Sequence, residues 1–127
     1  MTPTQRSTHY LRKQGFIVCR VEQTLHMPGR PWGNKKDAFG FRDLLAMSDE
    51  GIALVQVTSS DHVSHRVNKI RGVPTDLNDP KAVREAIDIA VNARAWQRAG
   101  GKIFVHGWAK RGPRGKRKVW TLREEIL

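Results

Sequence analysis

The sequence has one cysteine, few acidic residues and no long apolar run, and each shortage excludes a class of protein. A single cysteine, Cys19, rules out an intramolecular disulfide framework and a cysteine-rich zinc site, and is typical of a reducing compartment. No apolar run approaches the ~18 residues that a membrane span needs, and the N-terminal stretch lacks the apolar core of a signal peptide. We therefore expect a cytoplasmic protein with no membrane partner, and its 127 residues predict a single domain.

The scarcity of acidic residues leaves the chain strongly basic. Twelve Asp and Glu face 23 Lys and Arg, so the formal net charge is +11. A hydrophobic content of 39% is enough for a core and argues against a disordered polycation. An excess of this size indicates a polyanionic partner, which is most often nucleic acid.

The excess charge is concentrated in residues 109–118, AKRGPRGKRK, which we call the basic hairpin tip. Its glycines and proline predict a turn, and the apolar runs at 103–108 and 119–122 predict the two strands of a β-hairpin. A solvated turn without a partner is the alternative, but uncompensated cations repel each other unless phosphates screen them. The segment contains no acid and six basic residues: Lys110, Arg111, Arg114, Lys116, Arg117 and Lys118.

The hydrophobic periodicity predicts an α/β or α+β domain, with a mixed central sheet flanked by helices in the order αβββααββ. The longest helix is expected after Asp79, an N-cap residue, with Pro80 at its first position. Prolines and glycines between 28 and 33 predict a long loop over 23–40. We expect helices at about 4–14, 61–71 and 80–99, and strands at 15–22, 41–47, 52–59, 103–108 and 119–122.

Oxygen-bearing side chains occur on two neighbouring predicted strands. Asp43 lies at the start of one strand, and Gln56 lies on the next strand, 13 positions later. Thr58 shares a face with Gln56 because strand side chains alternate. In one interpretation, the face of the strand that carries Gln56 and Thr58 simply becomes exposed to solvent at this end. In the other, Asp43 and Gln56 point oxygens into one pocket, where they suit a hard cation such as Mg²⁺.

These segments resemble the PD-(D/E)XK nuclease superfamily. The succession of helix, strand, glycine-rich loop, D-L-L-A-M strand, L-V-Q-V-T-S strand and helix is similar to archaeal-type Holliday junction resolvases. The D-x-F-G-F-x-D-L-L-A segment, the V-Q-V-T-S strand and a later H-G-W are similar to small uncharacterised phage and prophage proteins. The resemblance covers about residues 8–108. It implies a restriction-endonuclease-like fold, Mg²⁺ or Mn²⁺ as cofactor, DNA as partner, phosphodiester hydrolysis as reaction, and a homodimer where two strands are cut.

By position, Asp43 matches the aspartate of the superfamily motif, Gln56 replaces its acid and Thr58 replaces its lysine. A glutamine carbonyl can still bind a metal but adds no charge, and threonine cannot act as a cation. Substitutes for the missing cation are Arg66 and Lys69 on the following helix, or Lys35 and Lys36 in the loop. Glu22 and Asp37 are candidates for additional metal ligands, with a surface charge and a turn-forming residue as their respective alternatives.

The resemblance assigns contacts with DNA as well. Arg66 or Lys69 would hold the scissile phosphate, and the basic hairpin tip would bind the flanking backbone. Among the tryptophans, Trp32 in the loop is the best candidate for base stacking, whereas Trp108 and Trp120 are expected to form a cross-strand pair that supports the hairpin. Cys19 is expected in the core, and the five histidines show no metal-ligand spacing.

Three hypotheses follow from the sequence. The first is a metal-dependent DNA endonuclease, acting on branched or junction DNA in a single nuclease-like domain. The second is a nuclease-fold protein that has lost catalysis and only binds DNA, which the departures at Gln56 and Thr58 favour. The third is a basic RNA-binding protein, and the charge alone supports it.

Overall fold

The computed structural model describes residues 1–21 and 43–127, together with the backbone of 23–26 and 33–36. Three α-helices and seven strands lie in these ranges, and a short 3₁₀ helix, η2 (Ser60–His62), precedes the second helix. The helices are α1 (Pro3–Lys13), α2 (Val63–Ile70) and α3 (Pro80–Arg98). The strands are β1 (Ile17–Arg20), β2 (Gln23–His26), β3 (Gly33–Lys36), β4 (Leu44–Ser48), β5 (Gly51–Ser59), β6 (Lys102–Arg111) and β7 (Val119–Ile126).

The main sheet contains five strands in the order β1-β4-β5-β6-β7. Neighbouring strands are antiparallel except β5 and β6, which run parallel. A parallel pair needs a crossover connection, and α2 and α3 supply it. The protein is therefore an α+β domain with a mixed sheet, as the sequence predicted at this level.

The predicted loop over 23–40 is wrong in part, because it contains two short strands. Strands β2 and β3 pair antiparallel as a separate two-stranded sheet, so the chain has two strands more than the predicted order αβββααββ. The prolines and glycines that indicated a loop fall between the two strands or at the start of the second one. Of these residues, only Gly33 lies within the described part of the chain, as the first residue of β3.

Helix boundaries follow from their caps. Asp79 accepts a hydrogen bond from the backbone N–H of Lys81 at 3.0 Å, as expected for an N-cap, and Pro80 begins α3. The start of α1 differs from the prediction. Thr2 is its N-cap and forms a capping box with Gln5, whose Oε1 accepts from the Thr2 N–H at 2.8 Å.

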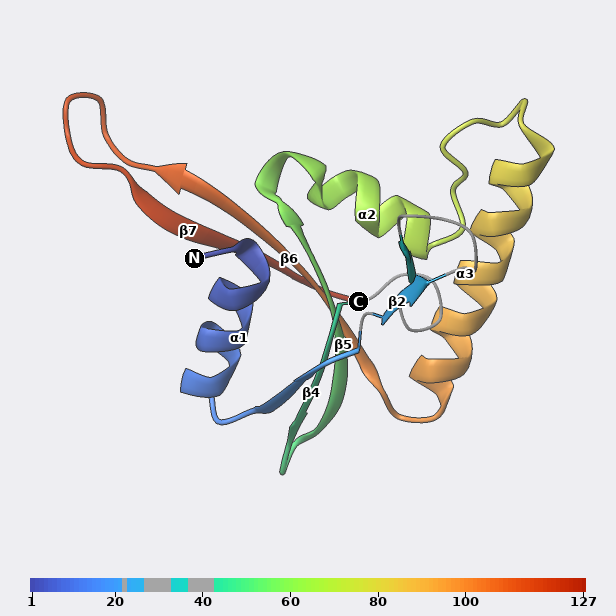
Figure 1. Ribbon diagram of the computed structural model, residues 1–127, viewed down its shortest axis with the longest axis horizontal. Coiled ribbons are helices and arrows are strands. Elements are labelled where there is room, and N and C mark those ends of the chain that lie inside the picture. The colour runs from blue at the N-terminus through green and yellow to red at the C-terminus, as the bar shows by residue number, and fades with distance from the viewer. Residues whose placement is uncertain (22, 27–32, 37–42) are drawn as a thin grey trace.

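Helices cover both faces of the main sheet (Figure 1). Helix α1 covers the first face, the α1 face, where Leu11 packs against Leu44, Val55 and Phe104. Helices α2 and α3 cover the second face, which we call the α2–α3 face. The core on that face contains the fully buried side chains of Val63, Ile103 and Val105 together with Ile70, Ile89 and Ala93.

Cys19 is exposed, contrary to the predicted core position. It lies on edge strand β1 next to Val18, and Val18 packs against the α1 side of the core. Because strand side chains alternate, Cys19 points to the other face, which no helix covers at this edge (Figure 1). Within the described ranges, none of the helices is long and apolar enough to span a bilayer.

Candidate functional site

Backbone hydrogen bonds to the chain on either side fix the position of Asp43. Its N–H donates to the carbonyl of Val55 at 3.0 Å, and its carbonyl accepts from the N–H of Val21 at 3.0 Å. The residue therefore lies where β4 begins, between the extension of β1 and strand β5. Its side chain is half-buried and keeps access to solvent.

The side chains of Asp43 and Gln56 meet across β4 and β5, as their spacing predicted. Oδ2 of Asp43 accepts a hydrogen bond from Nε2 of Gln56 at 3.3 Å and from the N–H of Val57 at 2.9 Å. Gln56 is only 5% exposed, on the strand face opposite Val55. The structure thus forms one half-buried pair of polar side chains, which we call the Asp43–Gln56 pair.

The pair offers hard oxygen ligands but few of them. Gln56 directs its amide nitrogen at the carboxylate, so a cation bound by both residues requires the amide to turn and present Oε1. Among the described residues, no group of three or more His, Cys, Asp or Glu lies close enough to hold a metal ion. Mg²⁺ is commonly bound by one or two carboxylates with water and substrate phosphate completing its shell, and the pair fits that pattern at its lower limit.

The other predicted site residues are distributed as follows. Thr58 is half-buried on β5, two positions beyond Gln56. Arg66 and Lys69 lie on α2 and are half-buried, and within the described part of the chain neither forms a hydrogen bond or an ion pair with the Asp43–Gln56 pair. Lys35 and Lys36 belong to β3, for which the backbone is described. Three predicted residues lie outside the described residues: Glu22, Trp32 and Asp37.

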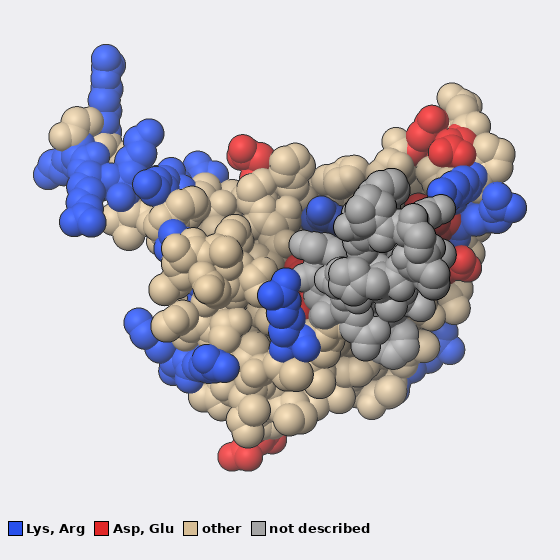
Figure 2. All heavy atoms as spheres, in the orientation of Figure 1, with Lys and Arg blue, Asp and Glu red and all other residues tan. Residues whose placement is uncertain are grey.

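The basic hairpin tip is confirmed as the end of a β-hairpin. Strands β6 and β7 pair antiparallel up to Arg111 opposite Val119, and the connection follows. All six basic side chains of the tip are exposed, and Figure 2 shows Lys and Arg gathered at this projecting end of the molecule. One of them is anchored, since Arg111 donates from Nη2 to Oγ of Ser60 at 3.3 Å.

Trp108 and Trp120 do not form the predicted cross-strand pair. Trp108 lies opposite Leu122, and Trp120 lies opposite Lys110, so the register separates the two rings. Instead, the guanidinium of Arg6 lies over the Trp120 ring at 4.1 Å, and Nζ of Lys110 is 5.5 Å from the same ring. The contact of Arg6 attaches α1 to the hairpin near its basic tip, and the contact of Lys110 lies within the hairpin.

A second polar cluster, which the sequence analysis missed, lies buried between α1 and the β6–β7 hairpin. His106 and Ser7 are both fully buried, and Nδ1 of His106 is 2.9 Å from Oγ of Ser7. Nε2 of His106 is 2.7 Å from Oε2 of Glu124, and Nε1 of Trp108 donates to Oγ of Ser7 at 2.9 Å. We call these four residues the His106 network.

One arrangement of hydrogens satisfies every polar group of the His106 network. Trp108 can only donate, so Ser7 accepts from it and uses its own O–H toward Nδ1 of His106. The N–H at Nε2 then donates to the carboxylate of Glu124. A serine, a histidine and an acid in contact also occur in nucleophilic active sites, but Ser7 is 0% exposed and has no route to a substrate. The network is structural.

The structure explains why His106, Gly107 and Trp108 follow one another in the H-G-W segment. His106 and Trp108 share the strand face that meets α1, and Gly107 lies between them on the other face. A Cβ on Gly107 would collide with Cγ2 of Val63 and approach Cα of Ser60 to 2.9 Å. Glycine is therefore required where β6 passes η2 and the start of α2.

The pKa of Tyr10 depends on the charge of Glu124 in the network. The Tyr10 ring packs edge-on to His106 with centroids 5.7 Å apart. Burial raises the pKa of the Tyr10 phenol above 10.0, and the negative charge of Glu124 raises this pKa further. The carboxylate of Glu124 therefore acts on α1 as well as on the strands.

Comparison with protein-family models, with curated proteins and with solved structures finds no match to this chain. The functional argument accordingly rests on the geometry of the Asp43–Gln56 pair, the basic hairpin tip and their surroundings.

Proposed function

We propose that the protein is a metal-dependent DNA endonuclease that hydrolyses phosphodiester bonds at the Asp43–Gln56 pair. The contact between Asp43 and Gln56 carries the proposal, because it brings together the two positions to which the PD-(D/E)XK resemblance assigns metal ligands. A half-buried carboxylate at the start of a strand, paired with a neutral amide, fits a role in binding a ligand.

The architecture supports the same proposal at a coarse level. The resemblance implies a restriction-endonuclease-like mixed sheet flanked by helices, and the main sheet is mixed with helices on both faces. The pair lies where β4 starts beside the central strand β5, which is the position that the resemblance requires. We therefore also propose that the sheet and its helices have the restriction-endonuclease-like arrangement.

The proposed cofactor is Mg²⁺ or Mn²⁺. Asp43 would hold it with its carboxylate and Gln56 with its amide oxygen, and such an ion lowers the pKa of bound water and neutralises charge on the phosphate. The two residues of the pair supply one negative charge, so their affinity for the free ion is expected to be low and to rise with bound DNA phosphate.

DNA is the proposed partner because the exposed positive charge is concentrated at one end of the molecule. The basic hairpin tip can bind the phosphate backbone without reading sequence.

A second candidate function is DNA binding without cleavage. The orientation of Gln56 favours it, because its amide nitrogen donates a hydrogen bond to the Asp43 carboxylate and its oxygen does not face the place of a metal ion. Thr58 also supplies no cation where the superfamily motif has a lysine.

The substitution Asp43→Asn separates the two functions. Asparagine can still accept from the N–H of Val57 through its oxygen, so we expect the fold and the DNA affinity to remain. Cleavage of supercoiled plasmid and of a four-way junction, measured with Mg²⁺, Mn²⁺ or EDTA, should fall at least about a hundredfold.

The matched control is Asp49→Asn, which removes one carboxylate from the exposed β4–β5 turn. It should cleave as the wild type does. If the wild-type protein binds DNA but never cuts it in either metal, the second candidate replaces the first. Preferential binding of RNA over both DNA substrates would contradict both.

A further inference from the structure

A groove between α1 and β1 lies on the α1 face of the main sheet, and the proposed site does not include it. It encloses about 250 Å³, and we call it the α1–β1 groove. Buried Leu44 and half-buried Val18 form its floor. Two turns of α1 form one wall, because positions four apart fall on one side of a helix. The lining residues are Thr4, Gln5, Thr8, His9, Arg12, Val18, Arg20 and Leu44.

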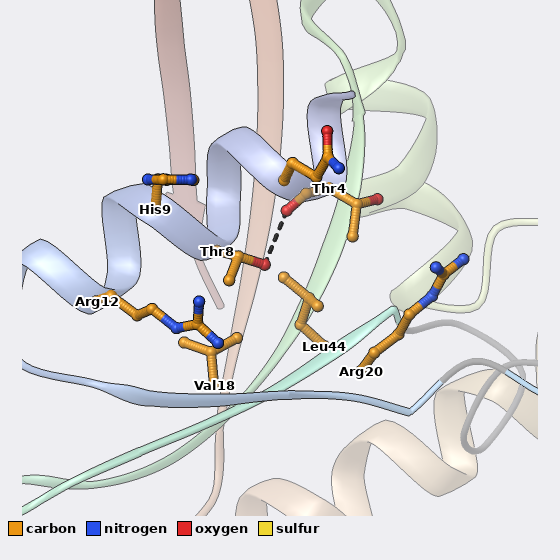
Figure 3. Close-up of a pocket in the computed structure, with 8 residues that line it drawn as sticks. Thr4, Thr8, His9, Arg12, Val18, Arg20 and Leu44 are labelled. Atoms are coloured by element: carbon orange, nitrogen blue, oxygen red, sulfur yellow. Dashed lines mark hydrogen bonds between the residues drawn. The ribbon is translucent and has the colours of Figure 1, made fainter. Parts of the chain in front are cut away.

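The polar lining of the groove is cationic. Arg12 comes from α1 and Arg20 from β1, and they lie at opposite ends of the groove with Val18 and Leu44 between them (Figure 3). None of the described lining residues is acidic. His9 and Gln5 add N–H groups, since Oε1 of Gln5 is already used by the capping box and leaves Nε2 to donate. This combination of arginines and neutral donors recognises phosphate.

The size of the groove limits what enters it. Pockets that enclose a whole small molecule usually measure about 300–1,000 Å³, and the groove is smaller and open. It accommodates one phosphate and its sugar, with the remainder of the ligand outside. An apolar floor between two arginines matches a sugar flanked by successive phosphates of a nucleic-acid strand.

The position of the groove connects it with the basic hairpin tip. Leu44 and Val18 of its floor lie on the α1 face of the sheet, whereas Gln56 lies on the α2–α3 face because strand side chains alternate. At the other end of α1, Arg6 lies over Trp120 at the base of the basic hairpin tip. Helix α1 therefore extends from the tip to the groove along one face of the protein.

We propose that the α1–β1 groove binds a sugar–phosphate unit of a DNA strand on the α1 face of the sheet, with Arg12 and Arg20 contributing to the contacts with its phosphates. The inference rests on the proposed function for its ligand, and it assigns α1 as the segment that guides the strand from the basic hairpin tip along this face. Binding in the groove does not require a metal ion.

The test measures DNA affinity in EDTA, so that cleavage plays no part. The double variant Arg12→Gln/Arg20→Gln is compared with Lys13→Gln/Arg98→Gln, which loses the same charge at exposed helix positions outside the groove. Each lost phosphate contact lowers the slope of log K against log salt by about 0.9 and the affinity at 0.1 M salt by about eightfold. We expect a loss of about 60-fold for the groove variant, and a much smaller loss for the control. The triple variant Lys116→Gln/Arg117→Gln/Lys118→Gln is the reference for contacts at the tip.

A second variant tests the groove without any risk to the fold. Gln5→Glu keeps the capping box, since glutamate is preferred at this position, and places a negative charge near the positive end of the helix dipole. Thermal stability should stay the same or rise, while DNA affinity falls at least fivefold because a carboxylate now faces the phosphate.

The proposal and the proposed function fail in different ways. If the groove variants bind DNA as tightly as their control, the groove is not a DNA contact, whatever Asp43→Asn does to cleavage. If deoxynucleoside monophosphate binds with an Arg12 dependence while DNA affinity is unchanged, the groove takes a small anion and the assignment to DNA is overturned. If cleavage is absent but the groove variants lose affinity, the groove stands and the nuclease does not.

Discussion

The His106 network and the Asp43–Gln56 pair both place a carboxylate beside a neutral polar side chain in the same sheet, but they differ in closure. In the network, His106 and Ser7 are 0% exposed, and every donor of the four side chains has an acceptor. In the pair, Gln56 is buried while Asp43 remains half-exposed at the start of β4. The centre of the network is thus closed, while its carboxylate, Glu124, lies at the edge with 27% of its side chain exposed.

From this difference we infer that the His106 network stabilises the fold and that the Asp43–Gln56 pair serves function. A closed buried network contributes to folding, because removing one member leaves the others without partners in a medium of low polarity. A half-exposed pair at a strand end loses less on substitution, since water can replace a missing partner. The comparison therefore predicts large stability effects and no specific loss of activity at the network, and the reverse at the pair.

The largest effect is expected for His106→Ala. The substitution opens a cavity and leaves Ser7 and Glu124 without their partner, so the free energy of unfolding should fall by about 3–5 kcal/mol. Urea unfolding followed by circular dichroism measures this loss. The folded fraction of the variant should still bind DNA with wild-type affinity.

The matched control is His62→Ala, which removes an exposed histidine whose Nδ1 lies 2.7 Å from Oγ of Ser59. It should change the free energy of unfolding by less than about 1 kcal/mol. If the two alanine variants were equally stable, the His106 network would not be the structural element that its closure indicates.

An intermediate effect is expected for Gln56→Glu, which gives the pair a second carboxylate. Without metal, like charges at this separation should lower stability, and Mg²⁺ should restore it. We expect the Mg²⁺ concentration at half-maximal stabilisation to fall at least about tenfold relative to wild type, because Coulomb attraction to the ion increases. Thermal unfolding against Mg²⁺ concentration measures this without any reference to cleavage.

Thr75→Glu, in an exposed loop, adds the same charge elsewhere and serves as the control. Equal responses to Mg²⁺ in both variants would show that the pair does not attract a cation.

The smallest effect is expected for Tyr10→Phe at high pH. The folded pKa of Tyr10 is raised above its unfolded value of 10.0 by burial and then by Glu124. Its contribution to stability is therefore complete below about pH 10 and is lost as pH rises through the raised pKa. The urea midpoint of wild type relative to that of the variant should stay constant up to about pH 10 and fall as pH rises further.

The substitution Glu124→Gln separates the two causes of the raised Tyr10 pKa. It removes the negative charge of Glu124 and leaves Tyr10 as buried as before. The pKa of Tyr10, followed by phenolate absorbance, should then fall part of the way back. No change would mean that Glu124 carries no charge in the network.

The sequence predicted the elements whose signals are local. Asp79 and Pro80 mark the start of α3, and the basic turn between two apolar runs marks the β6–β7 hairpin. The strand alternation also placed Gln56 correctly opposite Asp43. The loop over 23–40 was wrong in part because prolines and glycines punctuate hairpins and loops alike.

The misses share a physical cause. Cys19 has the neighbours of a core residue, but its exposure depends on whether a helix covers that edge of the sheet. Trp108 and Trp120 flank the basic tip symmetrically in sequence, and only the register of the strands separates them. No local pattern connects Ser7 with His106, because 99 positions separate them.

The amino-acid order alone accounts for the net charge, its concentration in the basic hairpin tip, and the spacing of Asp43 and Gln56, since composition and short-range periodicity are properties of neighbouring residues. The packing of helices against the sheet accounts for the rest: α1 forms the His106 network and brings Arg12 and Arg20 to one groove, and η2 with α2 imposes the requirement for Gly107. These depend on contacts between distant segments. Such contacts form only when burial of apolar side chains brings the helix and strands together.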